Sequence, residues 1–167
     1  MKKYVYLGGF IEGLRWEKAF EWREKAEILL KDIGISCYNP VVNVPESFRT
    51  NNGIITFDNV SSEKTFNEVK NGKILTADMP DNIRNEIFHQ SLFHLKQSNI
   101  CLFNLKWFKI ENYPIGTFWE ISTAVALGKL TVAFDEHPSL VVNPFIQNLI
   151  NLNYDSLDES LDYIVRL

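Results

Sequence analysis

The sequence lacks the features that mark several common classes of protein. It contains two cysteines among 167 residues, which does not indicate a disulfide-rich secreted fold. Both Cys37 and Cys101 lie in apolar, strand-like runs, and we expect buried, reduced thiols. No apolar run approaches the ~20 residues of a membrane span. The first residues turn polar too soon for a signal peptide. We therefore expect a cytoplasmic protein that has no membrane partner.

The chain also lacks a large excess of charge of either sign. The chain carries 17 basic and 21 acidic residues, for a net charge of −4. Binding along a nucleic-acid backbone normally needs a basic face, so a nucleic-acid polymer is not the expected partner. A small uncharged ligand or a mononucleotide remains compatible with this composition.

Motifs for metal and phosphate chemistry are absent as well. His89 and His94 are five residues apart and do not share a helix face, and no Cys/His spacing suggests zinc. The chain has no Gly-x-Ser-x-Gly elbow, no GxGxxG fingerprint and no Walker loop. We expect neither a metal ion nor a cofactor.

The apolar patterning predicts strands that alternate with helices. Strands are expected at 3–7, 35–38, 100–105 and 130–134, and helices at 14–32, 83–97, 117–127, 144–149 and from 156 onward. In the helix at 83–97, Phe88 and Phe93 are expected to face the core. This order predicts a single α/β domain over 1–167, with a small doubly wound, flavodoxin-like parallel sheet and helices on both faces. The irregular stretch at about 41–81 is interpreted as an insertion, such as a lid or specificity loop.

In such a fold, ligands bind at the carboxyl ends of the strands. Gly8 and Gly9 end the first strand, where a glycine pair lets backbone amides approach a ligand or simply makes a tight turn.

Glu120 is the main chemical candidate, in the first turn of the helix predicted at 117–127. Thr117 and Glu120 have the spacing of a capping box, in which Glu120 would only satisfy a backbone amide. Alternatively, the helix N-terminus would favour an ionised carboxylate that attacks an anomeric carbon, as in glycosidases.

Four motifs together resemble the nucleoside 2-deoxyribosyltransferase family in its broad sense, which includes nucleoside monophosphate N-glycosidases. They are VYLGGF at 5–10, YNP at 38–40, QSNICLFNL at 97–105, and GTFWEI at 116–121 followed by Ala124 and ALGK at 126–129. The resemblance implies that Glu120 is the nucleophile that attacks C1′ and expels the base. It implies that Tyr6 orients this glutamate as the second catalytic residue.

The same resemblance implies a substrate-binding set. Gly8, Gly9 and Phe10 fall on the segment that lines the sugar site. Arg15 is a candidate contact for a 5′-phosphate, or else a solvated helix residue. Asn143 would contact the sugar in its own subunit or in a neighbouring subunit of a homo-oligomer, or would cap the helix that starts at Pro144. The remaining candidates belong to the motifs or align with a family position: Ser91, Asn104, Gly116 and Thr117.

Three positions depart from the family pattern. Ser91, Asn99 and Pro114 stand where relatives carry aspartates. The acid that protonates the departing base is therefore unassigned, with Asp58, Asp78, Asp81 and Glu86 as candidates.

Three functions remain open from the sequence. The first is transfer of deoxyribose between free bases. The second is hydrolysis of a nucleoside 5′-monophosphate. The third is a nucleotide-binding module without turnover, which the departures at Ser91 and Pro114 favour. The expected partners are a nucleoside or nucleotide and a free base.

Overall fold

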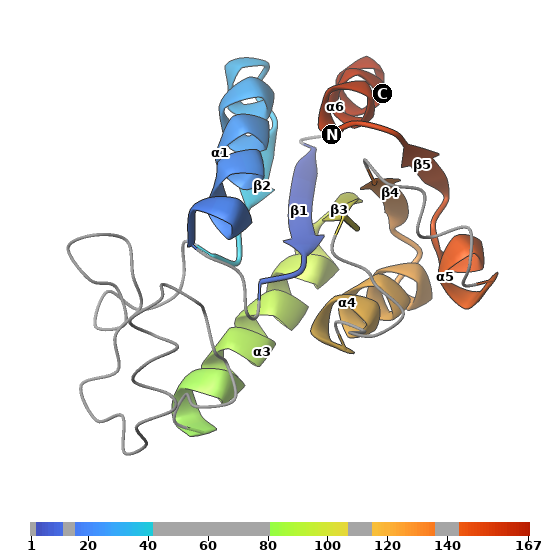
Figure 1. Cartoon of the computed structure of the whole chain (residues 1–167). Coiled ribbons are helices and arrows are strands. Elements are labelled where there is room, and N and C mark those ends of the chain that lie inside the picture. The colour runs from blue at the N-terminus through green and yellow to red at the C-terminus, as the bar shows by residue number, and fades with distance from the viewer. Residues whose placement is uncertain (1–2, 12–15, 42–80, 107–114, 136–143) are drawn as a thin grey trace.

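The computed structural model describes residues 3–11, 16–41, 81–106, 115–135 and 144–167. They form one sheet of five parallel strands in the order β2-β1-β3-β4-β5 (Figure 1). The strands are β1 (Tyr4–Gly9), β2 (Ser36–Tyr38), β3 (Ile100–Asn104), β4 (Leu130–Phe134) and β5 (Leu152–Tyr154). The helices are α1 (Trp16–Asp32), α3 (Asp81–Gln97), α4 (Ile115–Ala126), α5 (Pro144–Leu149) and α6 (Leu157–Arg166). The predicted flavodoxin-like doubly wound fold is confirmed.

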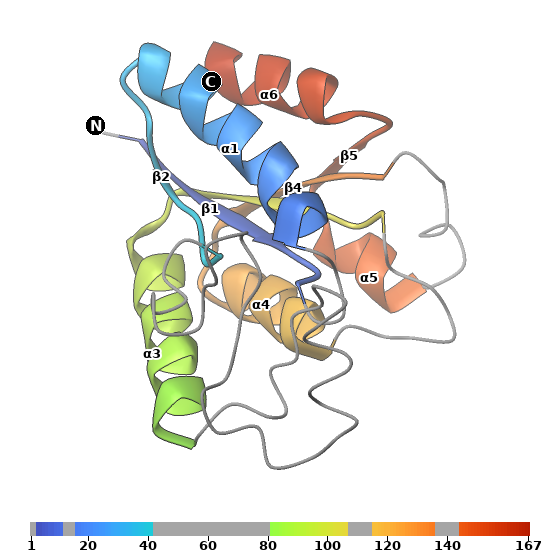
Figure 2. The same cartoon turned by 60° about the vertical axis from the view of Figure 1, so that its left-hand side comes forward.

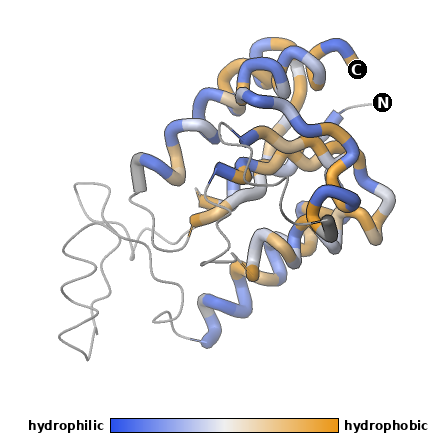
Figure 3. The backbone as a smooth tube through the Cα atoms, turned by 45° about the vertical axis from the view of Figure 1, so that its right-hand side comes forward, coloured by the Kyte–Doolittle hydropathy of each residue, from blue (hydrophilic) through white to orange (hydrophobic). Residues whose placement is uncertain are grey.

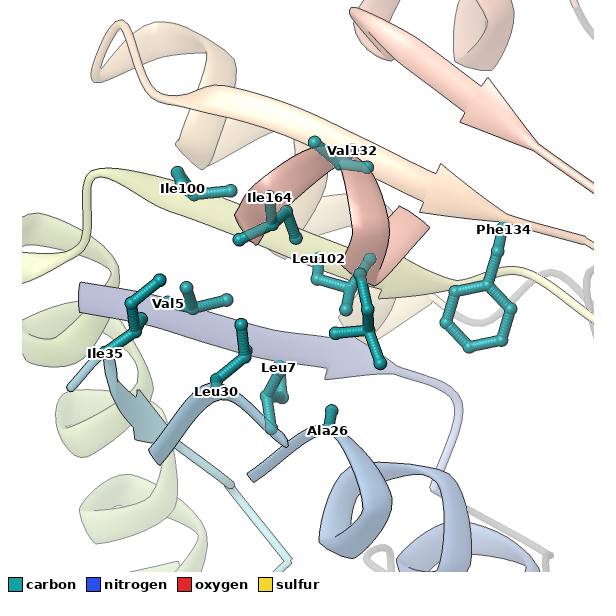
Figure 4. Packing of buried hydrophobic residues seen from close by; sticks show 11 residues of the cluster. Val5, Leu7, Ala26, Leu30, Ile35, Ile100, Leu102, Val132, Phe134 and Ile164 are labelled. Atoms are coloured by element: carbon teal, nitrogen blue, oxygen red, sulfur yellow. The ribbon is translucent and has the colours of Figure 1, made fainter. Parts of the chain in front are cut away.

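Helices cover both faces of the sheet because side chains alternate between its faces along each strand. Helices α1 and α6 lie on one side, and α3, α4 and α5 on the other (Figure 2). Val5 and Leu7 point into the α1/α6 layer, where they pack with Leu30, Leu102 and Ile164 (Figure 4).

The opposite face of the sheet holds a second apolar cluster. Tyr6 and Phe103 pack there with Leu95 of α3 and Ile121 of α4. Burying each leucine, isoleucine or phenylalanine side chain of this cluster contributes about 1.5–3 kcal/mol. The strands are therefore apolar, whereas the parts of the helices that face away from the sheet are largely hydrophilic (Figure 3).

Two glycines end helices and return the chain to the sheet. Gly34 and Gly128 have φ of 79° and 66°, the left-handed region that favours glycine. After them, the N–H groups of Ile35 and Lys129 each donate 2.9 Å bonds to carbonyls five residues back. These bonds cap the C-terminal ends of the two helices, and the chain enters β2 and β4 directly after them.

Several expectations need correction or lie outside the described ranges. The strand β5 was not predicted. Phe88 and Phe93 were wrongly assigned to the core, since they are 44% and 57% exposed on α3. The irregular insertion falls almost entirely in 42–80, outside the described residues.

Both thiols are free, and burial raises the pKa of each to about 12. Cys101 is buried as expected, whereas Cys37 is half-buried. Within the described ranges, no helix is both long and apolar enough to cross a bilayer.

Candidate active site

The candidate site lies where the strand order reverses. From β1 the chain crosses to β2 on one side, whereas β3 leads to β4 and β5 on the other. At the carboxyl ends of the two central strands, Gly8 pairs with Phe103 and Gly9 with Asn104. Ligands of open α/β sheets bind at such a switch point.

Glu120 reaches this point from α4, but not from the helix position predicted. The helix begins at Ile115, so Glu120 lies in its second turn. Thr117 is the third helical residue and is buried, so it is not the N-cap residue. The capping-box interpretation of Thr117 and Glu120 is therefore wrong. The N-terminus of α4 is also farther from the carboxylate than expected, which weakens the argument from the helix dipole.

The Glu120 carboxylate is held by partners from β1. The Tyr6 hydroxyl donates a 2.6 Å hydrogen bond to Oε1, the length of a strong bond to a charged acceptor. The Gly9 N–H also donates to this carboxylate. The close approach requires glycine at position 8, because a Cβ there would lie 2.3 Å from the Phe103 ring and 3.2 Å from Oε2.

The electrostatics of this pair follow from its burial. Burial raises the pKa of Glu120 from its ordinary value to about 7, although the Tyr6 bond, the Arg23 charge and the Gly9 N–H oppose the rise. Burial and the neighbouring carboxylate raise the pKa of Tyr6 well above its ordinary value. Tyr6 is thus a permanent hydrogen-bond donor near neutral pH, and Glu120 changes charge there. A strongly shifted carboxyl at a switch point is typical of a functional site.

Arg23 of α1 is a site residue that the sequence reasoning missed. Its side chain is fully buried, and it donates to the backbone carbonyls of Leu7 (3.1 Å) and Gly9 (2.9 Å). The signal was its helical spacing from Ala19, Ala26 and Leu30, all of which are buried.

Ser91 also belongs to the site. It is buried on α3, and its side chain hydrogen-bonds the Tyr6 phenol. Asn99 does not belong to it. Its side chain accepts a 3.1 Å bond from the Tyr4 N–H at the amino end of the sheet, opposite the site.

The other predicted residues divide by position. Asn104 is buried at the end of β3, where its side chain accepts a 3.0 Å bond from the Lys106 N–H. Phe10 is half-buried directly after Gly9, and Gly116 is exposed in the first turn of α4. Arg15, Pro114 and Asn143 lie outside the described residues.

Neither of the described candidates is placed to act as the acid that protonates the departing base. Asp81 is exposed and pairs with Arg84, and Glu86 is exposed and accepts a bond from Gln90. Asp58 and Asp78 fall outside the described ranges. Among the residues that the structure places, no group of three His, Cys, Asp or Glu side chains is arranged to hold a metal ion.

No protein-family model and no curated protein sequence matches this chain. Solved structures do match it. A 2-deoxyribosyltransferase from the psychrotolerant bacterium Bacillus psychrosaccharolyticus is 19% identical, with a TM-score of 0.62 over 96% of this chain and 91% of that one. The CMP N-glycosidase BcmB of Clostridium botulinum is 15% identical, with a TM-score of 0.52 over 97% of both chains. A 2-deoxyribosyltransferase of Leishmania mexicana gives 15% identity and a TM-score of 0.52 over 98% of this chain and 97% of that one. The chain thus shares, over nearly its whole length, the fold of 2-deoxyribosyltransferases and of a CMP N-glycosidase.

Proposed function

We propose that this protein is an enzyme that cleaves the N-glycosidic bond of a deoxynucleoside, with Glu120 as the nucleophile. The observation that carries the proposal is the Glu120 carboxylate at the switch point, fixed by the 2.6 Å bond from Tyr6. Fixing a nucleophile in one orientation lowers the entropic part of a reaction barrier. The shared fold and the motif resemblance support the same chemistry.

The proposed reaction has two steps. A Glu120 carboxylate oxygen forms a bond to C1′ while the bond from C1′ to the base nitrogen breaks, and the base leaves with the electron pair and takes up a proton. A nitrogen of a second base then attacks C1′, losing its proton, and releases the carboxylate. If water attacks instead, the products are the free sugar and a proton.

Tyr6 serves the first step by its geometry. Its hydroxyl holds Oε1 and so fixes the orientation of the carboxylate that attacks. Glycine at position 8 lets the strand pass close to both the Phe103 ring and Oε2, because a Cβ there would lie 2.3 Å from the ring and 3.2 Å from Oε2. Glu120 reacts in its ionised form, so the reaction should accelerate as pH rises toward neutrality.

Hydrolysis of a nucleoside 5′-monophosphate is the second candidate. The observation that favours it is the fold shared with the CMP N-glycosidase over 97% of both chains. Transfer is the first candidate because the structural match with a TM-score of 0.62 is to a 2-deoxyribosyltransferase, whereas the match to the CMP N-glycosidase has a TM-score of 0.52.

One assay distinguishes these reactions. The protein is incubated with a deoxynucleoside plus a different free base, and separately with a deoxynucleoside 5′-monophosphate, and products are separated by chromatography. A nucleoside of exchanged base supports transfer, whereas release of free base from the monophosphate alone supports hydrolysis. Binding of either compound without product would contradict an enzymatic function.

The same assay tests the nucleophile. Glu120→Gln should abolish turnover, since an amide oxygen cannot form the glycosyl ester. Glu24→Gln is the matched control, because Glu24 is exposed on α1. Full activity of Glu120→Gln would refute the assignment of Glu120.

A further inference from the structure

Arg23 is a buried cation whose position calls for a functional explanation. Its side chain has no exposed surface, and removing a charge from water is costly unless it is compensated. Among the described residues, the ion pairs involve Lys18, Lys25 and Arg84, and none includes Arg23. The guanidinium instead donates to the backbone carbonyls of Leu7, Gly9 and Ala19, and lies over the Trp22 ring.

The sheet itself creates the need for these donors. Strand β2 ends at Tyr38, whereas its neighbour β1 continues to Gly9. The ladder starts with the Ser36 N–H donating to the Lys3 carbonyl, so a continued ladder would place Pro40 opposite the Leu7 carbonyl. Proline has no N–H to donate. Arg23 Nε supplies the missing donor at 3.1 Å, so the guanidinium replaces the absent part of β2.

Gly9 connects this arrangement to the carboxylate. Its carbonyl accepts a 2.9 Å bond from Arg23, and its N–H donates to Glu120. The residue has φ of 144°, and a Cβ on it would lie 3.0 Å from the Asn104 carbonyl oxygen. The Gly9 backbone is therefore held in one orientation between the cation and the carboxylate.

The positive charge of Arg23 also favours the ionised form of Glu120. It lowers the pKa of Glu120, which burial raises, and Glu120 in turn opposes the fall that burial causes in the pKa of Arg23. The other titratable groups that face Glu120 in the described structure are Tyr6 of β1 and Cys101 of β3. Burial raises the pKa of both, so both are neutral near pH 7. Arg23 is thus the charged group that faces Glu120 in the described part of the chain.

We propose that Arg23 is a positioning residue for Glu120: its guanidinium completes the edge of β1, fixes Gly9 against the carboxylate, and supplies a counter-charge to it. The inference rests on the proposed role of Glu120 as nucleophile. Arg23 does not contact the substrate, because it has no exposed surface. It should therefore affect kcat and its pH dependence but not KM.

The experiment separates charge from geometry with two variants and a control. Arg23→Gln removes the charge, whereas Arg23→Lys retains it but loses the planar fork of donors. Leu30→Ala is the control, because Leu30 is buried on the same helix and carries no polar group. The Glu120 carboxyl carbon is titrated by NMR in protein labelled with ¹³C-glutamate and assigned with Glu120→Gln. Hydrogen exchange of the Gly9 amide, kcat and KM are measured in parallel.

The expected results differ between the variants. Arg23→Gln should move the Glu120 titration to higher pH by about one unit, the effect of a charge at intermediate dielectric. Arg23→Lys should leave the titration nearly unchanged, accelerate exchange of the Gly9 amide, and lower kcat about tenfold at constant KM. Leu30→Ala should lower stability and change none of these quantities per folded molecule.

Two results would overturn the inference. One is an unchanged Glu120 titration in Arg23→Gln. The other is wild-type Gly9 exchange in Arg23→Lys, which decides the matter if Arg23→Gln does not fold. The titration and the exchange need no turnover, so they test Arg23 even if the wild-type protein proves inactive, which would instead contradict the proposed function.

Discussion

At the scale of single residues, the protonation state of Glu120 decides whether its carboxylate can attack. Burial raises its pKa to about 7, so the ionised form is complete only above neutral pH. We expect kcat/KM to rise about tenfold per pH unit below 7 and to level off above it, since this profile reports ionisation of the free enzyme. Rates measured from pH 5 to 9 test the expectation. Constant kcat/KM down to pH 5 would contradict it.

The Tyr6 hydrogen bond should matter for both rate and pH dependence. Tyr6→Phe removes the 2.6 Å bond that lowers the pKa of Glu120, so the acid limb should move to higher pH. A hydrogen bond to a charged group contributes about 1.5–3 kcal/mol, which corresponds to a loss in kcat of about 10- to 100-fold at pH 7.

Tyr163→Phe is the matched control for this change. Tyr163 packs in the opposite layer of the sheet, beside Tyr154. It should keep the wild-type rate and pH profile. An unshifted acid limb in Tyr6→Phe would show that the bond does not tune Glu120.

Prediction from sequence reached part of this residue network. The motif resemblance predicted that Tyr6 orients Glu120, and the structure brings the two side chains together, while their catalytic roles stay predictions. Arg23 was not found, because its charge suggests a solvated position and the helical spacing of apolar residues assigned Trp22 beside it to the core. The partners of Arg23 are backbone carbonyls, which leave no trace in side-chain patterns.

At the scale of elements, the glycines at the ends of strands and helices differ in what they do for the molecule. Gly9 has φ of 144°, and a Cβ on it would touch Asn104, whereas Gly128 has φ of 66°, and a Cβ on it would meet nothing within 4 Å. Gly9→Ala should therefore cost about 1–3 kcal/mol of stability and displace the N–H that holds Glu120.

Gly128→Ala serves as the comparison for Gly9→Ala. It should cost about 1–2 kcal/mol through its left-handed backbone alone. Denaturant unfolding gives both stabilities, and kcat per folded molecule should fall only for Gly9→Ala. Equal kcat in the two variants would mean that the Gly9 backbone has no part in the site.

Element boundaries show where local pattern fails. Strand β5 has three residues at the edge of the sheet, with none fully buried, so it lacks the apolar run that revealed β3. The start of α4 was placed two residues late because Thr117 looked like a capping residue. Its burial is a tertiary effect, and local propensity cannot report it.

At the scale of the whole molecule, alternating strands and helices were enough to predict a doubly wound sheet, because right-handed crossovers leave few alternatives. The strand order then fixes a switch point between β1 and β3, and residues distant in sequence meet there. Tyr6, Arg23, Ser91 and Glu120 come from four different elements. These residues meet because of the topology of the sheet. The separate sequence motifs predicted the meeting of Tyr6 and Glu120 only through their resemblance to a known family.

Building a site from a half-buried carboxyl should make global stability depend on pH. The folded pKa of Glu120 is raised above its unfolded value, so the folded state binds more protons between about 4.5 and 7. Its contribution to stability is present at low pH and is lost as pH rises through about 7. Glu120→Gln removes this penalty, and at pH 8 it should be more stable than wild type by about 2 kcal/mol, allowing for partial exposure of Glu120.

Chemical denaturation at pH 5 and pH 8 measures this difference, and the gain should shrink toward pH 5, where wild-type Glu120 is protonated in the fold. Glu24→Gln, a change at an exposed position, should show no such pH-dependent gain. A Glu120→Gln variant that is less stable than wild type at pH 8 would mean that the bonds from Tyr6 and Gly9 outweigh the cost of burying the charge. Stability would then increase, and not decrease, when Glu120 ionises, and the acid limb of activity should lie well below pH 7.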